Sequence, residues 1–112
     1  MDLNNMDIKE LGPIGAELND IDLTKLSDDE SSLIKKYFLD YSVIVFRNQR
    51  LEPEDLKNIS KLWGEASIHP VFQGIEGHPE IIEIQNYGEK YHTNAHWHSD
   101  VTFEECPPDA TL

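Results

Sequence analysis

The chain has 112 residues, of which 38% are hydrophobic and 9% aromatic, enough for one small domain with a core. Its formal net charge of −13 argues against nucleic acid or an anionic membrane surface as a partner, because both carry the same sign of charge. The single cysteine, Cys106, cannot form an internal disulfide, and no apolar stretch approaches the ~20 residues of a membrane helix. The composition therefore predicts a cytoplasmic protein with no membrane-spanning segment.

The first part of the chain predicts two short strands followed by a helix. The stretch "DIKELGPIGAELNDIDL" (7–23) alternates roughly between apolar and polar residues and is interrupted by Gly12, Pro13 and Gly15, as around a turn. In "SDDESSLIKKYFLDY" (27–41), Ser27 is the expected N-cap and Glu30 completes a capping box. The apolar residues that follow share one helical face, namely Leu33, Ile34, Tyr37, Phe38 and Tyr41.

The middle of the chain predicts another strand and another helix. "SVIVFR" (42–47) is a short β-branched run, typical of a strand buried on both faces. Pro53 suits the first turn of a helix that Gly64 ends. An apolar stripe on this helix is expected in the core and consists of Leu56, Ile59, Leu62 and Trp63.

The last part predicts extended structure. "IIEIQ" from Ile81 indicates a strand, and Thr93 through Phe103 indicates an extended segment that ends before Pro107 and Pro108. No repeat or linker divides the chain, so we predict one unit over residues 1–112 with an α+β order of elements.

Histidine and aspartate gather in "HWHSDVTF" (96–103). In a regular strand Asn94, His96, His98 and Asp100 would share one face. Residues two apart stand about 6.6 Å from each other, a gap that an imidazole and a short carboxylate can close on one ion, whereas His96 and Asp100 stand about twice as far apart. We therefore predict His98 and Asp100 as metal ligands. Such a pair begins the two-histidine, one-carboxylate set that leaves open positions on iron(II).

Other interpretations of the cluster stay open. An H-x-D tripeptide occurs by chance in many proteins, and His92 and His96 are of a kind more often found at the surface than on a metal. A small zinc or iron protein could use His96 or His92 together with His98 and Asp100. That arrangement requires the strand to bend sharply at the cluster.

The segment "NAHWHSDVTFEECPPDATL" (94–112) closely resembles the iron-binding segment of the taurine dioxygenase family. These are iron(II) and 2-oxoglutarate dependent enzymes, which also include 2,4-dichlorophenoxyacetate dioxygenases and alkylsulfatases. The resemblance covers nearly the whole chain in the same order. It includes the stretches "LGPIGAELNDIDLTKLSDDE", "SVIVFRNQRLEPEDL", "WGEASIHPVF" and "EGHPEII".

The resemblance implies roles for individual residues. His98 and Asp100 match two of the three iron ligands, and His69 matches the histidine that meets the sulfonate of taurine. Asn94 and Val101 match pocket residues. Their alternative interpretations are a loop histidine, a turn-capping asparagine and a core valine. Phe72 replaces a tyrosine whose hydroxyl contacts the sulfonate, which favours a related sulfonate, a sulfate ester or an aryloxy acid over taurine itself.

The resemblance also implies that the chain is the N-terminal portion of a longer enzyme. The family's fold is a double-stranded β-helix, or jelly roll, of which this chain would be an incomplete part. No histidine follows His98 and no arginine follows Arg50, so the third ligand and the arginines that hold 2-oxoglutarate are expected in a missing C-terminal part.

The expected activity is hydroxylation of a carbon next to a heteroatom in a small anionic substrate, with Fe(II), 2-oxoglutarate and O2. The 112 residues alone are expected to be inactive. The alternative is a non-catalytic remnant or a small metal-binding module, and a homo-oligomer is left open.

Overall fold

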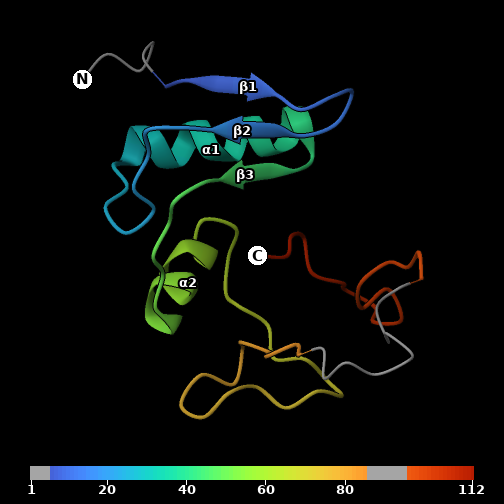
Figure 1. Cartoon of the computed structure of the whole chain (residues 1–112). Coiled ribbons are helices and arrows are strands. Elements are labelled where there is room, and N and C mark those ends of the chain that lie inside the picture. Colours follow the sequence, from blue (N-terminus) through green and yellow to red (C-terminus); the bar gives the residue numbers. More distant parts are fainter. Residues whose placement is uncertain (1–5, 86–95) are drawn as a thin grey trace. The chain divides into compact units, whose positions relative to one another are not determined.

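The computed structural model describes residues 6–85 and 96–112 (Figure 1). The chain divides into two compact units, Met1–Gly64 and Glu65–Leu112. The regular elements of the described residues belong to the first unit. They are β1 (Ile8–Glu10), β2 (Ala16–Leu18), α1 (Asp28–Tyr41), β3 (Ile44–Phe46) and α2 (Pro53–Ser60). Over the ranges described, no helix combines the length and apolarity needed to span a bilayer.

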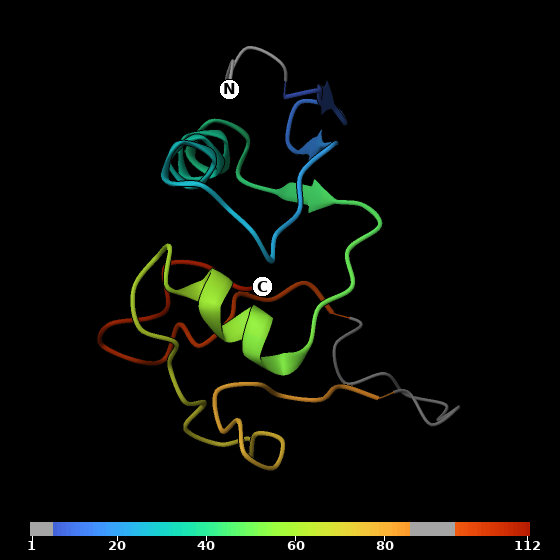
Figure 2. The ribbon, with the colours of Figure 1, turned by 90° about the vertical axis from the view of Figure 1, so that its left-hand side faces the viewer.

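The three strands form one small sheet in the order β1-β2-β3. β1 and β2 are antiparallel, with Ile8 opposite Leu18, because a tight turn joins them. Gly15 adopts φ +96° in this turn and accepts a hydrogen bond from the Leu11 amide at 3.0 Å. β2 and β3 are parallel, since the connection between them contains α1, and α1 lies on one face of the sheet (Figures 1 and 2).

Helix α1 begins and ends at residues suited to these positions. The Ser27 hydroxyl accepts a hydrogen bond from the Glu30 amide at 3.1 Å, and the Glu30 carboxylate accepts one from the Ser27 amide at 2.9 Å. This reciprocal pair is the predicted capping box. At the other end Ser42 turns to φ +67°, and its amide donates to the Phe38 carbonyl at 2.8 Å.

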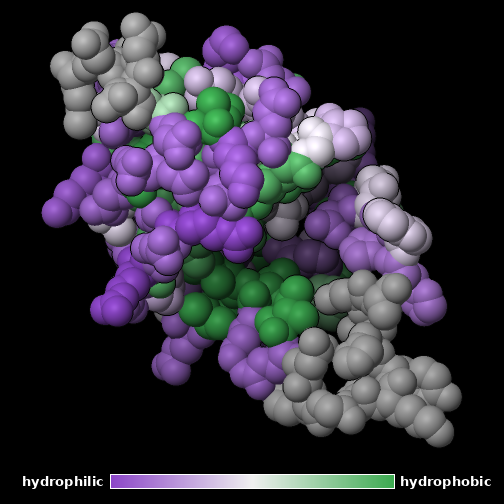
Figure 3. Space-filling model, turned by 45° about the horizontal axis from the view of Figure 1, so that its top comes forward, coloured by the Kyte–Doolittle hydropathy of each residue, from purple (hydrophilic) through white to green (hydrophobic). Residues whose placement is uncertain are grey.

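A small apolar core lies between the sheet and the two helices. Its buried members are Leu18, Ile21, Leu23, Ile34 and Ile59. The predicted apolar faces of both helices contribute to it, with Tyr37, Leu62 and Trp63 packed around these five residues. Hydrophilic residues cover most of the face drawn in Figure 3, where a hydrophobic area is also exposed.

Gln49 joins the loop after β2 to the loop after β3. Its side-chain oxygen accepts from the Leu23 amide at 3.1 Å, while its nitrogen donates to the carbonyls of Ile21 at 2.8 Å and Arg47 at 3.0 Å. The side chain thus satisfies three backbone groups that lie outside the sheet and the helices.

Two predictions for the first unit need adjustment. β3 is a strand, but its three side chains are half-buried rather than buried on both faces, because β3 is an outer strand of the described sheet. Helix α2 ends at Ser60, and a series of tight turns continues to Gly64, in which the Leu62 and Trp63 amides bond to carbonyls three residues earlier. Trp63 still packs on the core.

The predicted strand from Ile81 to Gln85 is wrong. These residues have no strand partner in the described part of the chain. Instead, the Ile81 amide donates to the His78 carbonyl at 3.1 Å, and the Ile81 carbonyl accepts from Ile75 at 2.8 Å, which closes a compact loop. Gly74 lies so near the Pro79 carbonyl that a side chain would not fit there.

Candidate metal centre

The segment from His96 to Phe103 does not form the predicted regular strand. Val101 has φ +51°, and its carbonyl accepts a hydrogen bond from the Glu104 amide at 3.2 Å, so the chain turns directly after Asp100. The prediction of an extended segment is therefore wrong here, because a left-handed residue cannot continue a pleated strand. Residues 93–95 lie outside the described part of the chain.

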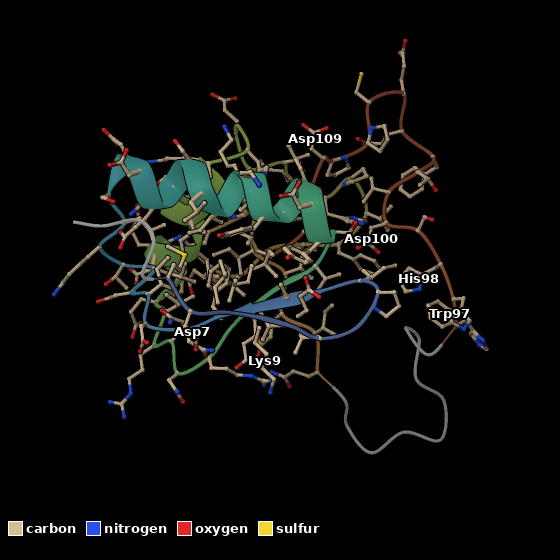
Figure 4. All side chains as sticks on the ribbon, turned by 90° about the horizontal axis from the view of Figure 1, so that it is seen from above. Asp7, Lys9, Trp97, His98, Asp100 and Asp109 are labelled. Atoms are coloured by element: carbon tan, nitrogen blue, oxygen red, sulfur yellow. The ribbon has the colours of Figure 1, made fainter. Side chains whose placement is uncertain are left out.

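The two predicted ligands nevertheless lie close together. His98 Nε2 lies 3.2 Å from Asp100 Oδ1, and Figure 4 shows both residues on the same C-terminal segment. His98 Nδ1 lies 2.7 Å from the backbone carbonyl of His96. A carbonyl oxygen only accepts hydrogen bonds, so Nδ1 carries the proton and Nε2 faces the carboxylate.

This arrangement suits a cation. In a neutral imidazole with its proton on Nδ1, the Nε2 lone pair faces Asp100 Oδ1, and two such electron-rich atoms repel each other unless a positive charge lies near both. A proton on Nε2 or a bound metal ion would supply that charge.

The distance between the two donor atoms fits a chelate. With metal–ligand bonds of about 2.1 Å, two ligands at a right angle lie about 3.0 Å apart and two at the tetrahedral angle about 3.4 Å apart. The observed 3.2 Å lies between these values. His98 and Asp100 could therefore serve as neighbouring ligands of one ion without a large movement.

The pair is open to solvent. The side chains of His98 and Asp100 are 51% and 55% exposed, so ions and small molecules can reach them. Within the described ranges, no group of three His, Cys, Asp or Glu residues is placed to hold a metal. Trp97 is fully exposed and its side chain points outward from the segment (Figure 4). If both side chains bound one ion, most of its coordination positions would stay open to other ligands.

His96 contacts His98 in a way that differs from both sequence-based interpretations, a surface histidine and a metal ligand. Its backbone carbonyl, rather than its imidazole, contacts His98. Such an interaction fixes the tautomer and ring orientation of a ligand histidine. This contact depends on the backbone conformation between His96 and His98, so it could not be predicted from the sequence. His92 lies outside the described residues.

His69 lies in a turn of its own. Its Nδ1 accepts hydrogen bonds from the amides of Val71 and Phe72, both at 3.0 Å. Because Nδ1 is occupied as an acceptor, the proton of the neutral ring resides on Nε2, which is left as a donor. The Phe72 ring lies 4.8 Å from the His69 ring, at an interplanar angle of 44°.

The structure unites some of the predicted site residues and separates others. His98 and Asp100 form a pair, and His69 and Phe72 form another. Among the described residues, no hydrogen bond, ion pair or ring contact links one pair to the other. Val101 supplies the turn after Asp100, and Asn94 lies outside the described residues.

One residue of this region was not predicted from the sequence. The Thr111 hydroxyl lies 3.5 Å from Asp100 Oδ2, on the carboxylate oxygen that does not face His98. The contact joins residues eleven apart across a turn, a separation that no strand or helix period connects.

Comparison with known proteins places this geometry in context. The family model described as "Taurine catabolism dioxygenase TauD, TfdA family" matches residues 7–112. An alpha-ketoglutarate-dependent sulfate ester dioxygenase from Pseudomonas putida is 30% identical over 104 residues, covering 90% of this chain and 34% of that protein. An alpha-ketoglutarate-dependent sulfonate dioxygenase from Saccharomyces cerevisiae is 26% identical over 123 aligned positions, covering 98% of this chain and 30% of that protein.

A solved structure gives a concordant result. The crystal structure of a taurine dioxygenase from Burkholderia xenovorans matches with a TM-score of 0.60 and 40% sequence identity, over 66% of this chain and 28% of that chain. The present chain spans about a third of the length of the curated relatives, 34% and 30% respectively. With a family match that begins at residue 7 and includes the His98–Asp100 pair, the chain belongs to the TauD, TfdA family of taurine catabolism dioxygenases.

Proposed function

We propose that this chain is the N-terminal portion of a single jelly-roll dioxygenase domain that binds Fe(II) through His98 and Asp100. The observation that carries the proposal is the 3.2 Å separation of His98 Nε2 and Asp100 Oδ1, which suits neighbouring ligands of one ion. Family membership supports the choice of iron, with 2-oxoglutarate and O2 as the other reactants.

The chain's own residues prepare the metal site. The His96 carbonyl holds the proton of His98 on Nδ1, which leaves Nε2 available as a ligand. Iron(II) with 2-oxoglutarate would insert one atom of O2 into a substrate C–H bond, the other entering succinate as carbon dioxide is released. The third protein ligand and the arginines for 2-oxoglutarate would come from residues beyond this chain, since no histidine follows His98 and no arginine follows Arg50.

The proposed substrate is a small organic anion. His69 would donate a hydrogen bond from Nε2 to the anionic group, because its Nδ1 is already bonded to two backbone amides. Phe72 beside it has no hydroxyl and adds only an apolar surface. Val101 and Asn94 would line the same pocket.

Among the candidates for this substrate are a taurine-like sulfonate, an alkyl sulfate and an aryloxy acid. Two relatives are named as sulfate ester and sulfonate dioxygenases, which supports a sulfur-containing anion. Hydroxylation of the carbon next to the heteroatom gives an unstable product. It would break down to a carbonyl compound and release the anion.

The test uses the native protein from its source cells, captured with an antibody against the region around Lys57. Its intact mass is measured first, and a species well above 12.9 kDa is expected. This species is then incubated with Fe(II), ascorbate, O2, 2-oxoglutarate and each class of candidate substrate. Substrate-dependent succinate is expected, and its loss in Asp100→Ala would assign it to this site. A heavier species that forms no succinate with any of these substrates would contradict the proposal.

A second candidate is a non-catalytic metal-binding module made of this chain alone. The observation that favours it is the exposed His98–Asp100 pair. Among the described residues, no third His, Cys, Asp or Glu side chain lies where it could complete a metal site with this pair. A native species of 12.9 kDa that binds divalent metal but forms no succinate would support this module over the dioxygenase.

A further inference from the structure

The two oxygens of the Asp100 carboxylate have different neighbours. Oδ1 lies 3.2 Å from His98 Nε2, and Oδ2 lies 3.5 Å from the Thr111 hydroxyl. A carboxylate is planar and rigid, so a partner on one oxygen also determines where the other oxygen points. The Thr111 hydroxyl is the donor in this contact, because an ionised carboxylate only accepts.

The turn after Asp100 permits this contact. Val101 has φ +51°, a conformation that β-branched residues seldom adopt, and the Glu104 amide bonds to its carbonyl at 3.2 Å. A straight strand would carry the chain steadily away from Asp100. With the turn in place, a hydroxyl eleven residues later reaches the carboxylate.

We propose that Thr111 is a positioning residue for Asp100. Its hydroxyl holds Oδ2 so that Oδ1 and His98 Nε2 face the same point, where a metal ion would bind. This inference rests on the iron site proposed above and adds a residue that does not itself touch the metal. Hydrogen bonds to ligating carboxylates typically change metal affinity by about 10- to 100-fold, and the 3.5 Å contact of Thr111 belongs to the weak end of this range.

The experiment measures Mn(II) affinity of the 112-residue chain, with Mn(II) as a stable substitute for Fe(II). Free Mn(II) is quantified by electron paramagnetic resonance during titration, a method that also detects weak binding. Thr111→Val removes the hydroxyl but keeps the shape of the side chain, and Thr111→Ser keeps the hydroxyl. We expect Thr111→Val to weaken binding about 10-fold and Thr111→Ser to bind as the unaltered chain does.

Thr102→Val is the matched control. Thr102 lies in the same segment, and its hydroxyl has no hydrogen-bond partner among the described residues. This variant should bind Mn(II) as tightly as the unaltered chain. Equal weakening by Thr102→Val and Thr111→Val would show that any threonine replacement here disturbs the fold, and would overturn the positioning role.

A double-mutant cycle tests whether Thr111 acts through Asp100. In the Asp100→Ala background, Thr111→Val should have no further effect on Mn(II) affinity, because the carboxylate it would position is gone. A second 10-fold loss in that background would overturn the proposal, since it would place the action of Thr111 elsewhere.

A measurement without metal distinguishes the role of Thr111 from the existence of the metal site. Hα–Hβ coupling constants of Asp100 measured by NMR should indicate one dominant rotamer in the unaltered chain and averaging in Thr111→Val. If the unaltered chain shows that single rotamer but binds no Mn(II), His98 and Asp100 do not hold a metal ion by themselves, and the role of Thr111 in metal binding by this chain is overturned. If it binds Mn(II) and Thr111→Val binds equally well, only the role of Thr111 is overturned.

Discussion

The two units of the chain differ in how their residues are held. In Met1–Gly64, a three-stranded sheet and two helices enclose buried apolar side chains. In Glu65–Leu112, the described residues form turns and loops, and several large apolar side chains are exposed, among them Ile68, Val71, Phe72, Trp97 and Phe103. The proposed site residues all belong to this second unit.

The difference separates a part whose elements follow local signals from a part that holds the residues of the proposed site. Caps, turns and apolar stripes act over a few residues, and they set where the elements of the first unit begin and end. Side chains for binding and catalysis are commonly borne by loops, which contribute little burial of their own. We therefore expect mutations that alter stability to cluster in the first unit and mutations that alter ligand binding to cluster in the second.

The largest stability effect is expected at Ile34. This side chain is 1% exposed and lies in the core with Leu18 and Ile59. Ile34→Ala should lower the free energy of unfolding by about 3 kcal/mol, because it removes buried methyl groups and leaves a cavity. The measurement is urea denaturation of the purified chain, followed by the circular dichroism of its helices.

The matched control lies on the same helix. Leu39 is 81% exposed, so Leu39→Ala should change the free energy of unfolding by no more than about 0.5 kcal/mol. Equal effects of the two substitutions would mean that α1 does not pack as described. Stability effects would then not cluster at the buried residues of the first unit as we expect.

A smaller effect is expected at the N-terminus of α1. Ser27→Ala removes the hydroxyl that accepts from the Glu30 amide, which should destabilise the first unit by about 1 kcal/mol. Ser32→Ala, at an exposed position inside the helix, should be neutral or slightly stabilising because alanine is the better helix former. The same urea titrations measure both. A loss of stability in Ser27→Ala but not in Ser32→Ala is the diagnostic result, and an equal loss of stability in both variants would speak against the cap.

These local features explain how much of the fold could be predicted from the sequence. The strands around Gly15 and the capping box at Ser27 are set by neighbours within a few residues, and both are confirmed. The apolar stripe ending at Trp63 is confirmed in part, because Ile59, Leu62 and Trp63 belong to the core or pack against it and Leu56 does not. The strand expected from Ile81 failed because an apolar run becomes a strand only when another strand pairs with it. That condition does not appear in the run itself.

The candidate site could be predicted in part for the same reason. The pairing of His98 with Asp100 follows from their spacing, even though the regular strand assumed for it is wrong. The Thr111 contact depends on the left-handed turn at Val101, and valine gives no indication that such a turn occurs. The pairing of the His69 ring with two backbone amides likewise depends on loop geometry. The roles of these residues in binding stay predictions.

The smallest effect concerns a polar contact that ties the end of α1 to β1. The Tyr41 hydroxyl donates to the Glu10 carboxylate at 3.1 Å, and this hydrogen bond raises the pKa of Tyr41 above its ordinary value of 10.0. A raised pKa in the folded state means that the folded chain favours the protonated hydroxyl. The stabilisation is therefore fully present below about pH 10 and is lost as the pH rises through the folded-state pKa.

Thermal unfolding of the chain and of Tyr41→Phe, compared at about pH 8 and about pH 11, isolates this contribution. Between these two pH values, the midpoint temperature of unfolding should fall further for the unaltered chain than for Tyr41→Phe. The difference should be a few degrees at most, because the pair is exposed to solvent. Tyr37→Phe should retain most of the pH dependence, since the Tyr37 hydroxyl has no hydrogen-bond partner in the described residues and contributes least to the raised pKa of Tyr41. If Tyr41→Phe loses as much stability at high pH as the unaltered chain, the helix is not tied to β1 by this contact. The cohesion of the first unit would then rest on its apolar core, its sheet and the hydrogen bonds of Gln49.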